Sequence, residues 1–120
     1  MASILVVDDD DNTRSLIKTI LERRGHQVSV AQNGLEGLAR FEEGPQDLVV
    51  TDLVMPGIGG LALVAELQRR QSPPKVLIVS GNKVRPDADM SSLQGRGLVA
   101  FVQKPFTPTE LAQSVQSLIG

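Results

Sequence analysis

Hydrophobic residues gather along the chain in five short runs, at residues 4–7, 27–31, 48–51, 76–79 and 99–102. The first, third and fourth runs do not alternate with polar residues, which is typical of strands that are covered on both faces. Between the runs, apolar residues recur three and four positions apart, as in amphipathic helices. These sets are Leu16, Ile17, Ile20 and Leu21; Leu35, Leu38 and Phe41; Leu61, Leu63, Val64 and Leu67; and Leu111, Val115, Leu118 and Ile119. The pattern predicts a strand followed by a helix, repeated five times.

Turn residues mark several boundaries of these elements. Gly25 suits a left-handed cap after the first helix, and Gly44 with the following proline closes the second. Residues 107–110 form a capping box with Pro108 at the first helical position. The fourth helix is the least marked, and we expect it to be short, at about residues 87–94. We predict a single α/β domain with a doubly wound, five-stranded parallel sheet.

Polar residues stand where the predicted strands end, and sheets of this kind place their sites outside the carboxyl ends of the strands. These residues are Asp8 and Asp9 after the first run, Asp52 after the third, Ser80 after the fourth and Lys104 after the fifth. Three carboxylates form a hard oxygen site, which suits a hydrated Mg²⁺ ion better than an enclosed Ca²⁺ ion. The sequence therefore predicts a cation site with a hydroxyl and an ammonium group beside it.

The same residues indicate a phosphoryl-transfer reaction. Asp52 stands alone after an apolar strand, so one of its oxygens can bind the metal while the other attacks an activated phosphoryl group. Mg²⁺, the Lys104 ammonium and the Ser80 hydroxyl can each neutralise charge on one equatorial oxygen. The expected product is an acyl phosphate on Asp52.

Composition narrows the classes of function. The 120 residues suit one domain, and the formal charge of −2 equals the charge of the three aspartates and Lys104 together. Direct nucleic-acid binding is not expected, because the chain has no run of Lys or Arg and no Tyr or Trp. The absence of cysteine excludes disulfides and thiolate chemistry. Neither a signal peptide nor a membrane span is evident, so we expect a cytoplasmic location without membrane contact.

Four motifs follow one another in a characteristic order: ILVVDDD at residues 4–10, TDLVMPG at 51–57, IVSG at 78–81 and QKPF at 103–106. Each motif is modest alone, but together they resemble the response-regulator receiver domain of two-component phosphorelay systems. The resemblance covers residues 1–120 as one receiver domain. It implies the flavodoxin-like (βα)5 fold that such domains have.

The resemblance also implies a role for the acidic residues. Asp52 corresponds to the phospho-acceptor of the family. Asp8 and Asp9 correspond to residues that hold Mg²⁺ or Mn²⁺, together with Asp52 and the backbone carbonyl of Val54. By the same resemblance, the domain is a signalling phospho-acceptor that catalyses only its own phosphorylation and dephosphorylation, and is not an enzyme in the usual sense.

Ser80 and Lys104 correspond to the family's phosphoryl-binding residues, and the bond from Lys104 to Pro105 corresponds to a cis peptide. In the family, phosphorylation draws the hydroxyl inward and lets an aromatic residue three positions before the lysine follow. Phe101 holds that position here and has no hydroxyl of its own. We expect it to switch an output surface formed by the fourth helix, fifth strand and fifth helix through packing alone.

The resemblance also implies that residues following Asp52 and Ser80 tune hydrolysis of the acyl phosphate. They are Val54, Gly81 and Asn82. Because an apolar Val54 cannot orient a water molecule, we hypothesise a long-lived phosphorylated form.

Partners follow from the resemblance. The phosphoryl donor is expected to be a sensor histidine kinase or a histidine phosphotransfer protein, and the output a downstream protein or a fused effector, with a homodimer as an option. One alternative is an aspartyl-phosphate hydrolase of the haloacid-dehalogenase type, which resembles D-x-D at its nucleophile, whereas Asp52 is followed by Leu53 and Val54. The other is a structural or protein-binding domain with an inactive pocket.

Overall fold

The computed structural model describes residues 2–44, 46–53, 57, 59–81 and 99–119. Strands and helices alternate along the chain. They are β1 (Ser3–Val7), α1 (Asp11–Glu22), β2 (Gln27–Ala31), α2 (Gly34–Glu43), β3 (Leu48–Asp52), α3 (Gly60–Gln68), β4 (Lys75–Ser80), β5 (Val99–Gln103) and α5 (Pro108–Ile119). The helix expected at residues 87–94 lies outside the described residues. In the described ranges, no helix is both long and apolar enough to cross a membrane.

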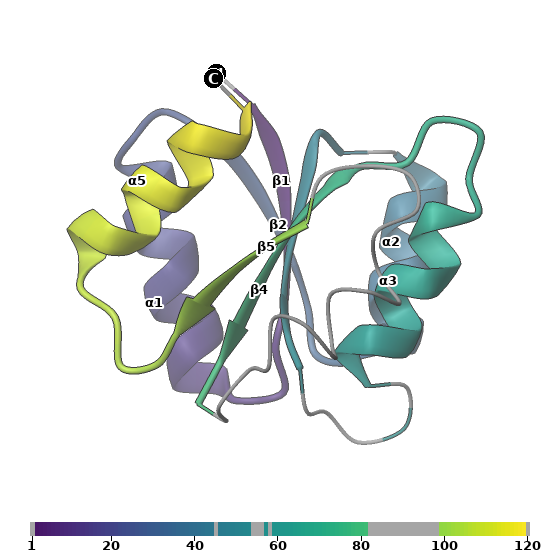
Figure 1. Cartoon of the computed structure of the whole chain (residues 1–120), viewed down its shortest axis with the longest axis horizontal. Coiled ribbons are helices and arrows are strands. Elements are labelled where there is room, and N and C mark those ends of the chain that lie inside the picture. Colours follow the sequence, from purple (N-terminus) through teal and green to yellow (C-terminus); the bar gives the residue numbers. More distant parts are fainter. Residues whose placement is uncertain (1, 45, 54–56, 58, 82–98, 120) are drawn as a thin grey trace.

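The strands form one parallel five-stranded sheet in the order β2-β1-β3-β4-β5. Helices α1 and α5 lie side by side on one face, and α2 and α3 cover the other (Figure 1). The predicted doubly wound sheet is therefore confirmed. Because the order reverses direction at β1, the carboxyl ends of β1 and β3 flank the point where such sheets form their sites.

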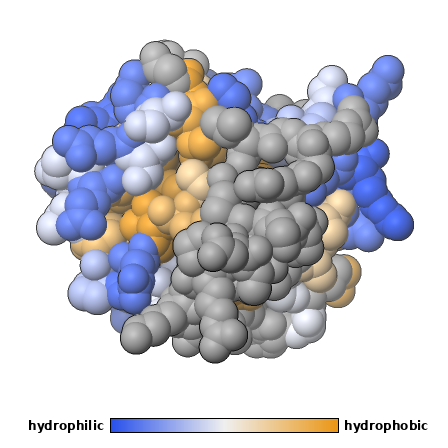
Figure 2. Space-filling model, in the orientation of Figure 1, coloured by the Kyte–Doolittle hydropathy of each residue, from blue (hydrophilic) through white to orange (hydrophobic). Residues whose placement is uncertain are grey.

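The apolar strands are explained by the two helical layers. Alternate residues of a strand point to opposite faces, so Val6 and Val50 pack with α1 and α5, whereas Leu5 and Val49 pack with α2 and α3. All four side chains are essentially inaccessible to solvent. Figure 2 shows hydrophilic residues over the outer helices and hydrophobic residues near the middle of the viewed face, beside the residues drawn in grey.

Three helix boundaries have a capping residue, and two of these residues, Gly25 and Thr107, are predicted from the sequence. Gly25, after α1, has a φ of +90°, the left-handed conformation that glycine adopts without strain. The side chain of Asp10 accepts a hydrogen bond from the Thr13 backbone N–H at the start of α1. At the start of α5, the Thr107 hydroxyl accepts one from the Glu110 backbone N–H at 3.1 Å.

Two leucines of the predicted helical stripes are exposed, contrary to the sequence pattern. Leu16 is 49% and Leu35 65% accessible. Successive helical residues are about 100° apart, so Leu16 lies beside the stripe of Ile17 and Leu21 that faces the sheet. Leu35 lies outside the inner stripe of α2 for the same reason, since the buried residues of this helix are Gly34, Gly37 and Phe41.

Because Leu16 is half exposed, Leu16→Gln is expected to change the free energy of unfolding by no more than about 0.5 kcal/mol. The neighbouring conservative change Ile17→Val removes one methyl group from a buried site and is expected to cost about 0.5–1.5 kcal/mol. Urea unfolding of both variants tests this order. If Leu16→Gln lost more free energy of unfolding than Ile17→Val, residue 16 would be buried in solution.

His26 ties the beginning of β1 to the turn before β2. The backbone N–H of Ala2 donates to Nδ1 of His26 at 3.2 Å, which requires that nitrogen to carry no proton. Burial lowers the pKa of His26 below its usual value of 6.5. The folded protein therefore favours the neutral imidazole.

We expect this contact to make stability depend on pH. Since the folded pKa of His26 is lowered, its contribution is fully present above 6.5 and is lost as the pH falls through the lower folded value. His26→Gln has no ionisable group at this position, so its loss of stability between about pH 7.5 and 5.5 should be smaller than that of the wild type. Urea unfolding at a series of pH values measures both slopes, and equal slopes would contradict the assignment to His26.

Candidate phospho-acceptor site

Five predicted site residues lie together where the carboxyl ends of the parallel strands meet, which we call the carboxyl edge of the sheet. Asp8 and Asp9 follow β1, Asp52 ends β3, Ser80 ends β4 and Lys104 follows β5. One carboxylate oxygen from each aspartate lies within 4.8 Å of the others. Parallel strands bring their carboxyl ends to one edge, so residues almost 100 positions apart meet there.

Asp8 is held at every polar atom of its backbone and side chain. It is buried, and its N–H donates to the Ala31 carbonyl at 3.2 Å. The Asp10 N–H donates to Asp8 Oδ1 at 2.9 Å, and Nη1 of Arg14 donates to the Asp8 carbonyl at 2.8 Å. Lys104 contacts the remaining oxygen, Oδ2. The Asp8 carboxylate is therefore fixed in position before any ligand binds.

Lys104 joins the two carboxylates from across the sheet. Its Nζ lies 3.1 Å from Asp52 Oδ2 and 3.5 Å from Asp8 Oδ2. Since β4 lies between β3 and β5, the lysine side chain reaches over the end of β4. The Lys104 N–H donates to the Ser80 carbonyl at 2.8 Å, and the peptide to Pro105 is cis, as the sequence predicts.

Burial and charge act in opposite directions on these groups. Burial raises the pKa of the Asp8 carboxyl, and it outweighs the Asp10 backbone hydrogen bond and the Lys104 charge, which lower that pKa. Burial alone would lower the pKa of Lys104, but the hydrogen bond to Asp52 and the charges of Asp8 and Asp52 raise it above its usual value. Lys104 is therefore charged at neutral pH, whereas ionisation of the buried Asp8 carboxyl costs free energy when no metal ion is bound.

The arrangement fits a divalent cation of the Mg²⁺ class. Three carboxylates against one ammonium leave two negative charges in a small volume, and all the charged ligand atoms are hard oxygens. Asp9 is exposed while Asp8 is buried, so an ion held between them would keep part of its water shell. The backbone carbonyl of Val54, expected as a further ligand, lies outside the described residues.

The remaining predicted residues take different places. Ser80 is buried at the end of β4, and the exposed Gly81 follows it, with room for a methyl group 4.0 Å from Lys104 Cβ. Phe101 is half-buried on β5 and packs against the cluster around Ile78. Asn82 and Val54, expected to tune hydrolysis, are outside the described part of the chain.

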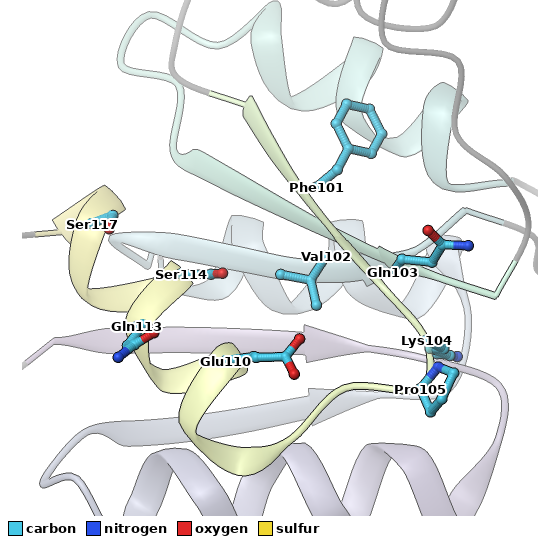
Figure 3. Close-up of a pocket in the computed structure, with 9 residues that line it drawn as sticks. All are labelled: Phe101, Val102, Gln103, Lys104, Pro105, Glu110, Gln113, Ser114 and Ser117. Carbon is cyan, nitrogen blue, oxygen red and sulfur yellow. The ribbon is translucent and has the colours of Figure 1, made fainter.

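A separate hollow of about 600 Å³ is lined by residues of β5 and α5, together with Lys104 and Pro105 (Figure 3). Its lining includes Phe101, Gln103, Glu110 and Ser114. In the figure, the side chains of Phe101 and Val102 point to opposite faces of β5, as the alternation of a strand requires. This hollow borders the predicted output surface and contains none of the three carboxylates.

Three residues that contact the site were not singled out from the sequence. Arg14 donates to the Asp8 carbonyl, and its side chain is 13% exposed. Thr51 donates to the Asp52 carbonyl, and Gly60 begins α3 against the same carbonyl. Two features of the sequence point to the last two of these residues: Thr51 is a threonine at the end of an apolar run, and Gly60 is a glycine at the beginning of a helix.

Fold and site together define a class of protein. A doubly wound parallel sheet, with paired carboxylates and a lysine at its switch point, can hold a cation and an anionic group side by side. Residues 4–116 match the response regulator receiver domain, and the chain belongs to this family.

Relatives agree with this assignment. The chain is 30% identical over 118 residues to the transcriptional regulatory protein ResD of Bacillus subtilis, covering 97% of this chain and 47% of ResD. It is 35% identical over 120 residues to the sensor kinase CckA of Brucella abortus, covering 98% of this chain and 12% of CckA. Among solved structures, the response regulator TrrA of Thermotoga maritima, in complex with Mg²⁺ and BeF, is 34% identical with a TM-score of 0.86, and the alignment covers 99% of this chain and 100% of that one.

The chain thus spans about half of ResD and a small part of CckA. As a receiver domain it is a phospho-acceptor module of two-component signalling and not a classical enzyme. This agrees with the sequence-based prediction and excludes the haloacid-dehalogenase alternative.

Proposed function

We propose that Asp52 accepts a phosphoryl group from a phosphohistidine of a sensor histidine kinase or a histidine phosphotransfer protein, with Mg²⁺ bound by Asp8, Asp9 and Asp52. The observation that carries this proposal is the position of Lys104 Nζ, 3.1 Å from Asp52 Oδ2 at the open carboxyl edge of the sheet. A positive charge beside the acceptor oxygen is what a transferring phosphoryl group requires.

In the proposed step, an Asp52 carboxylate oxygen forms a bond to phosphorus while the bond from phosphorus to the donor's imidazole nitrogen breaks. The donor's imidazole, protonated on its other ring nitrogen, leaves with the bonding electron pair and so ends neutral, and the product is an acyl phosphate on Asp52. The Leu53 N–H, which donates to Asp52 Oδ1 at 2.6 Å, holds the carboxylate in one orientation. Orientation of this kind makes the attack effectively unimolecular.

Lys104 and Ser80 stabilise the transferred group. The ammonium of Lys104 already lies between Asp8 and Asp52, so a short movement brings it to a phosphoryl oxygen. The Ser80 hydroxyl, at the end of the strand between β3 and β5, supplies a neutral hydrogen-bond donor. A bound Mg²⁺ ion would neutralise further charge on the phosphoryl oxygens.

The output surface of the proposed switch is formed by β5, α5 and the fourth helix that the sequence predicts at about residues 87–94. Phosphorylation adds about −1.5 to −2 charge beside Ser80 and Lys104. Lys104 follows β5 directly, and Phe101 lies three residues before it, so a shift of the lysine is transmitted to the strand that carries Phe101. The effector is a downstream protein or a domain fused to the receiver.

Several properties remain predictions of the sequence. They are the extent of the receiver domain over residues 1–120, the cytoplasmic location, the homodimer and the long life of the phosphorylated form. The last depends on Val54 and Asn82, and its test is the decay of the acyl phosphate in Mg²⁺ without a phosphatase.

Intact mass after incubation with acetyl phosphate and Mg²⁺ tests the proposed function. The wild type should gain one phosphate-sized increment, and Asp52→Asn should gain none. Asp47→Asn is a matched control, because Asp47 is an exposed aspartate at the opposite end of β3. An unmodified wild type would contradict the proposal and favour the structural-domain alternative, whereas an increment that persists in Asp52→Asn would contradict it by placing the modification on another residue.

A further inference from the structure

Gly60, the first residue of α3, lies against the backbone of Asp52. A methyl group built on Gly60 would meet the Asp52 carbonyl oxygen at 2.1 Å and Leu53 Cα at 2.8 Å. The Gly60 N–H donates to the Leu53 carbonyl at 2.9 Å, which holds the end of the helix in this position. The helix therefore approaches the acceptor residue as closely as a residue without Cβ allows.

Backbone conformation does not explain this glycine. Among the described residues, the glycines with a positive φ are Gly25 and Gly57. Gly60 starts a helix, and glycine is one of the least favourable residues for helices. What the position requires is space for the peptide that links Asp52 to Leu53.

A second residue holds the same carbonyl from the strand side. Thr51 is buried, and its Oγ1 donates to the Asp52 carbonyl at 3.0 Å. Strand alternation places its side chain on the face of Val49, which is the face that α3 covers. The Asp52 carbonyl is thus held between the Thr51 hydroxyl and the bare Cα of Gly60.

We infer that Gly60 and Thr51 are positioning residues, which fix the main chain of Asp52 so that its carboxylate meets the phosphoryl donor in a reactive orientation. The inference rests on the proposed phosphorylation of Asp52. Neither residue touches the phosphoryl group, and both act through the acceptor. A displacement of roughly 1 Å at a reacting group lowers a rate by about 100-fold.

Gly60→Ala tests the close approach. Its methyl group must move from 2.1 Å to the ordinary 3.4 Å or more from the Asp52 oxygen, so the acceptor peptide is displaced. We expect the rate at saturating acetyl phosphate and Mg²⁺ to fall by about 100-fold. Gly59→Ala is the matched control, because a methyl group there lies 3.4 Å from the nearest atom of the described residues, and its rate should stay close to that of the wild type. A folded Gly60→Ala protein that reacts as fast as Gly59→Ala would overturn the inference.

Substitutions of Thr51 keep the test decisive if Gly60→Ala fails to fold. Thr51→Val retains the buried methyl group and has a second methyl group in place of the hydroxyl, so its rate should fall by about fivefold, as for one hydrogen bond. Thr51→Ser retains the hydroxyl and loses a buried methyl group, so it should be less stable to urea but react faster than Thr51→Val. If the role of Thr51 were purely structural, the less stable variant, Thr51→Ser, would also react more slowly than Thr51→Val. That result would overturn the inference.

The wild type separates this inference from the proposed function. If the wild type and Gly59→Ala are both phosphorylated, a normal rate in Thr51→Val and Gly60→Ala overturns only the positioning role. If the wild type is not phosphorylated at all, the proposed function fails, and the positioning role fails with it.

Discussion

Lys104→Met is expected to slow the phosphorylation of Asp52 by about 10²–10³-fold, which is the effect of removing one preorganised donor from a charged transition state. Methionine has a similar length but no charge, so the change removes the ammonium that lies 3.1 Å from Asp52 and 3.5 Å from Asp8. The rate at which the phosphate-sized mass increment forms, at saturating acetyl phosphate and Mg²⁺ and neutral pH, measures the effect.

Lys75→Met is the matched control for this experiment. Lys75 is an exposed lysine at the first position of β4, at the opposite edge of the sheet, and its loss changes the net charge by the same amount. Its rate should equal that of the wild type. Equal rates for Lys104→Met and Lys75→Met would show that the lysine charge at the carboxyl edge does not act on the transferred group.

Asp8→Asn is expected to raise the Mg²⁺ concentration for half-maximal phosphorylation by about 100-fold or more. The change keeps an acceptor for the Asp10 N–H but removes the buried charge that a cation would neutralise. Titration of the phosphorylation rate with Mg²⁺ measures the shift. Asp10→Asn is the control, because Asp10 caps α1 through Thr13 and lies outside the carboxylate cluster.

The same variant should be more stable than the wild type without metal. Since burial raises the pKa of Asp8 above 3.8, the folded state binds the proton more tightly than the unfolded state does. Without metal, the contribution of the Asp8 carboxyl to the free energy of unfolding therefore increases as the pH falls through the folded pKa, and it is lowest at neutral pH. In EDTA at neutral pH, Asp8→Asn should unfold at a higher temperature, and Mg²⁺ at a concentration just sufficient to saturate the wild type should stabilise the wild type far more than the variant. Equal stabilisation of both proteins at that Mg²⁺ concentration would place the ion elsewhere.

Much of the site could be predicted because it depends on strand ends. Asp8 and Asp52 follow apolar runs, and a parallel sheet brings the ends of such runs to one edge whatever the details of packing. The exposure of Leu16 and Leu35 could not be predicted in this way. Spacing defines a stripe on a helix, but the rotation of that helix against the sheet decides which edge of the stripe is covered.

The sequence by itself determined the order of strands and helices, the helix caps at Gly25 and Thr107, and the identity of the residues at the carboxyl edge. These features depend on local spacing and on neighbouring residues, which are read directly from the chain. Only the tertiary structure decided that Lys104 spans both carboxylates over β4 and that Gly60 and Thr51 hold the Asp52 carbonyl. Those contacts depend on the distance between packed elements, and no periodicity along the sequence records such a distance.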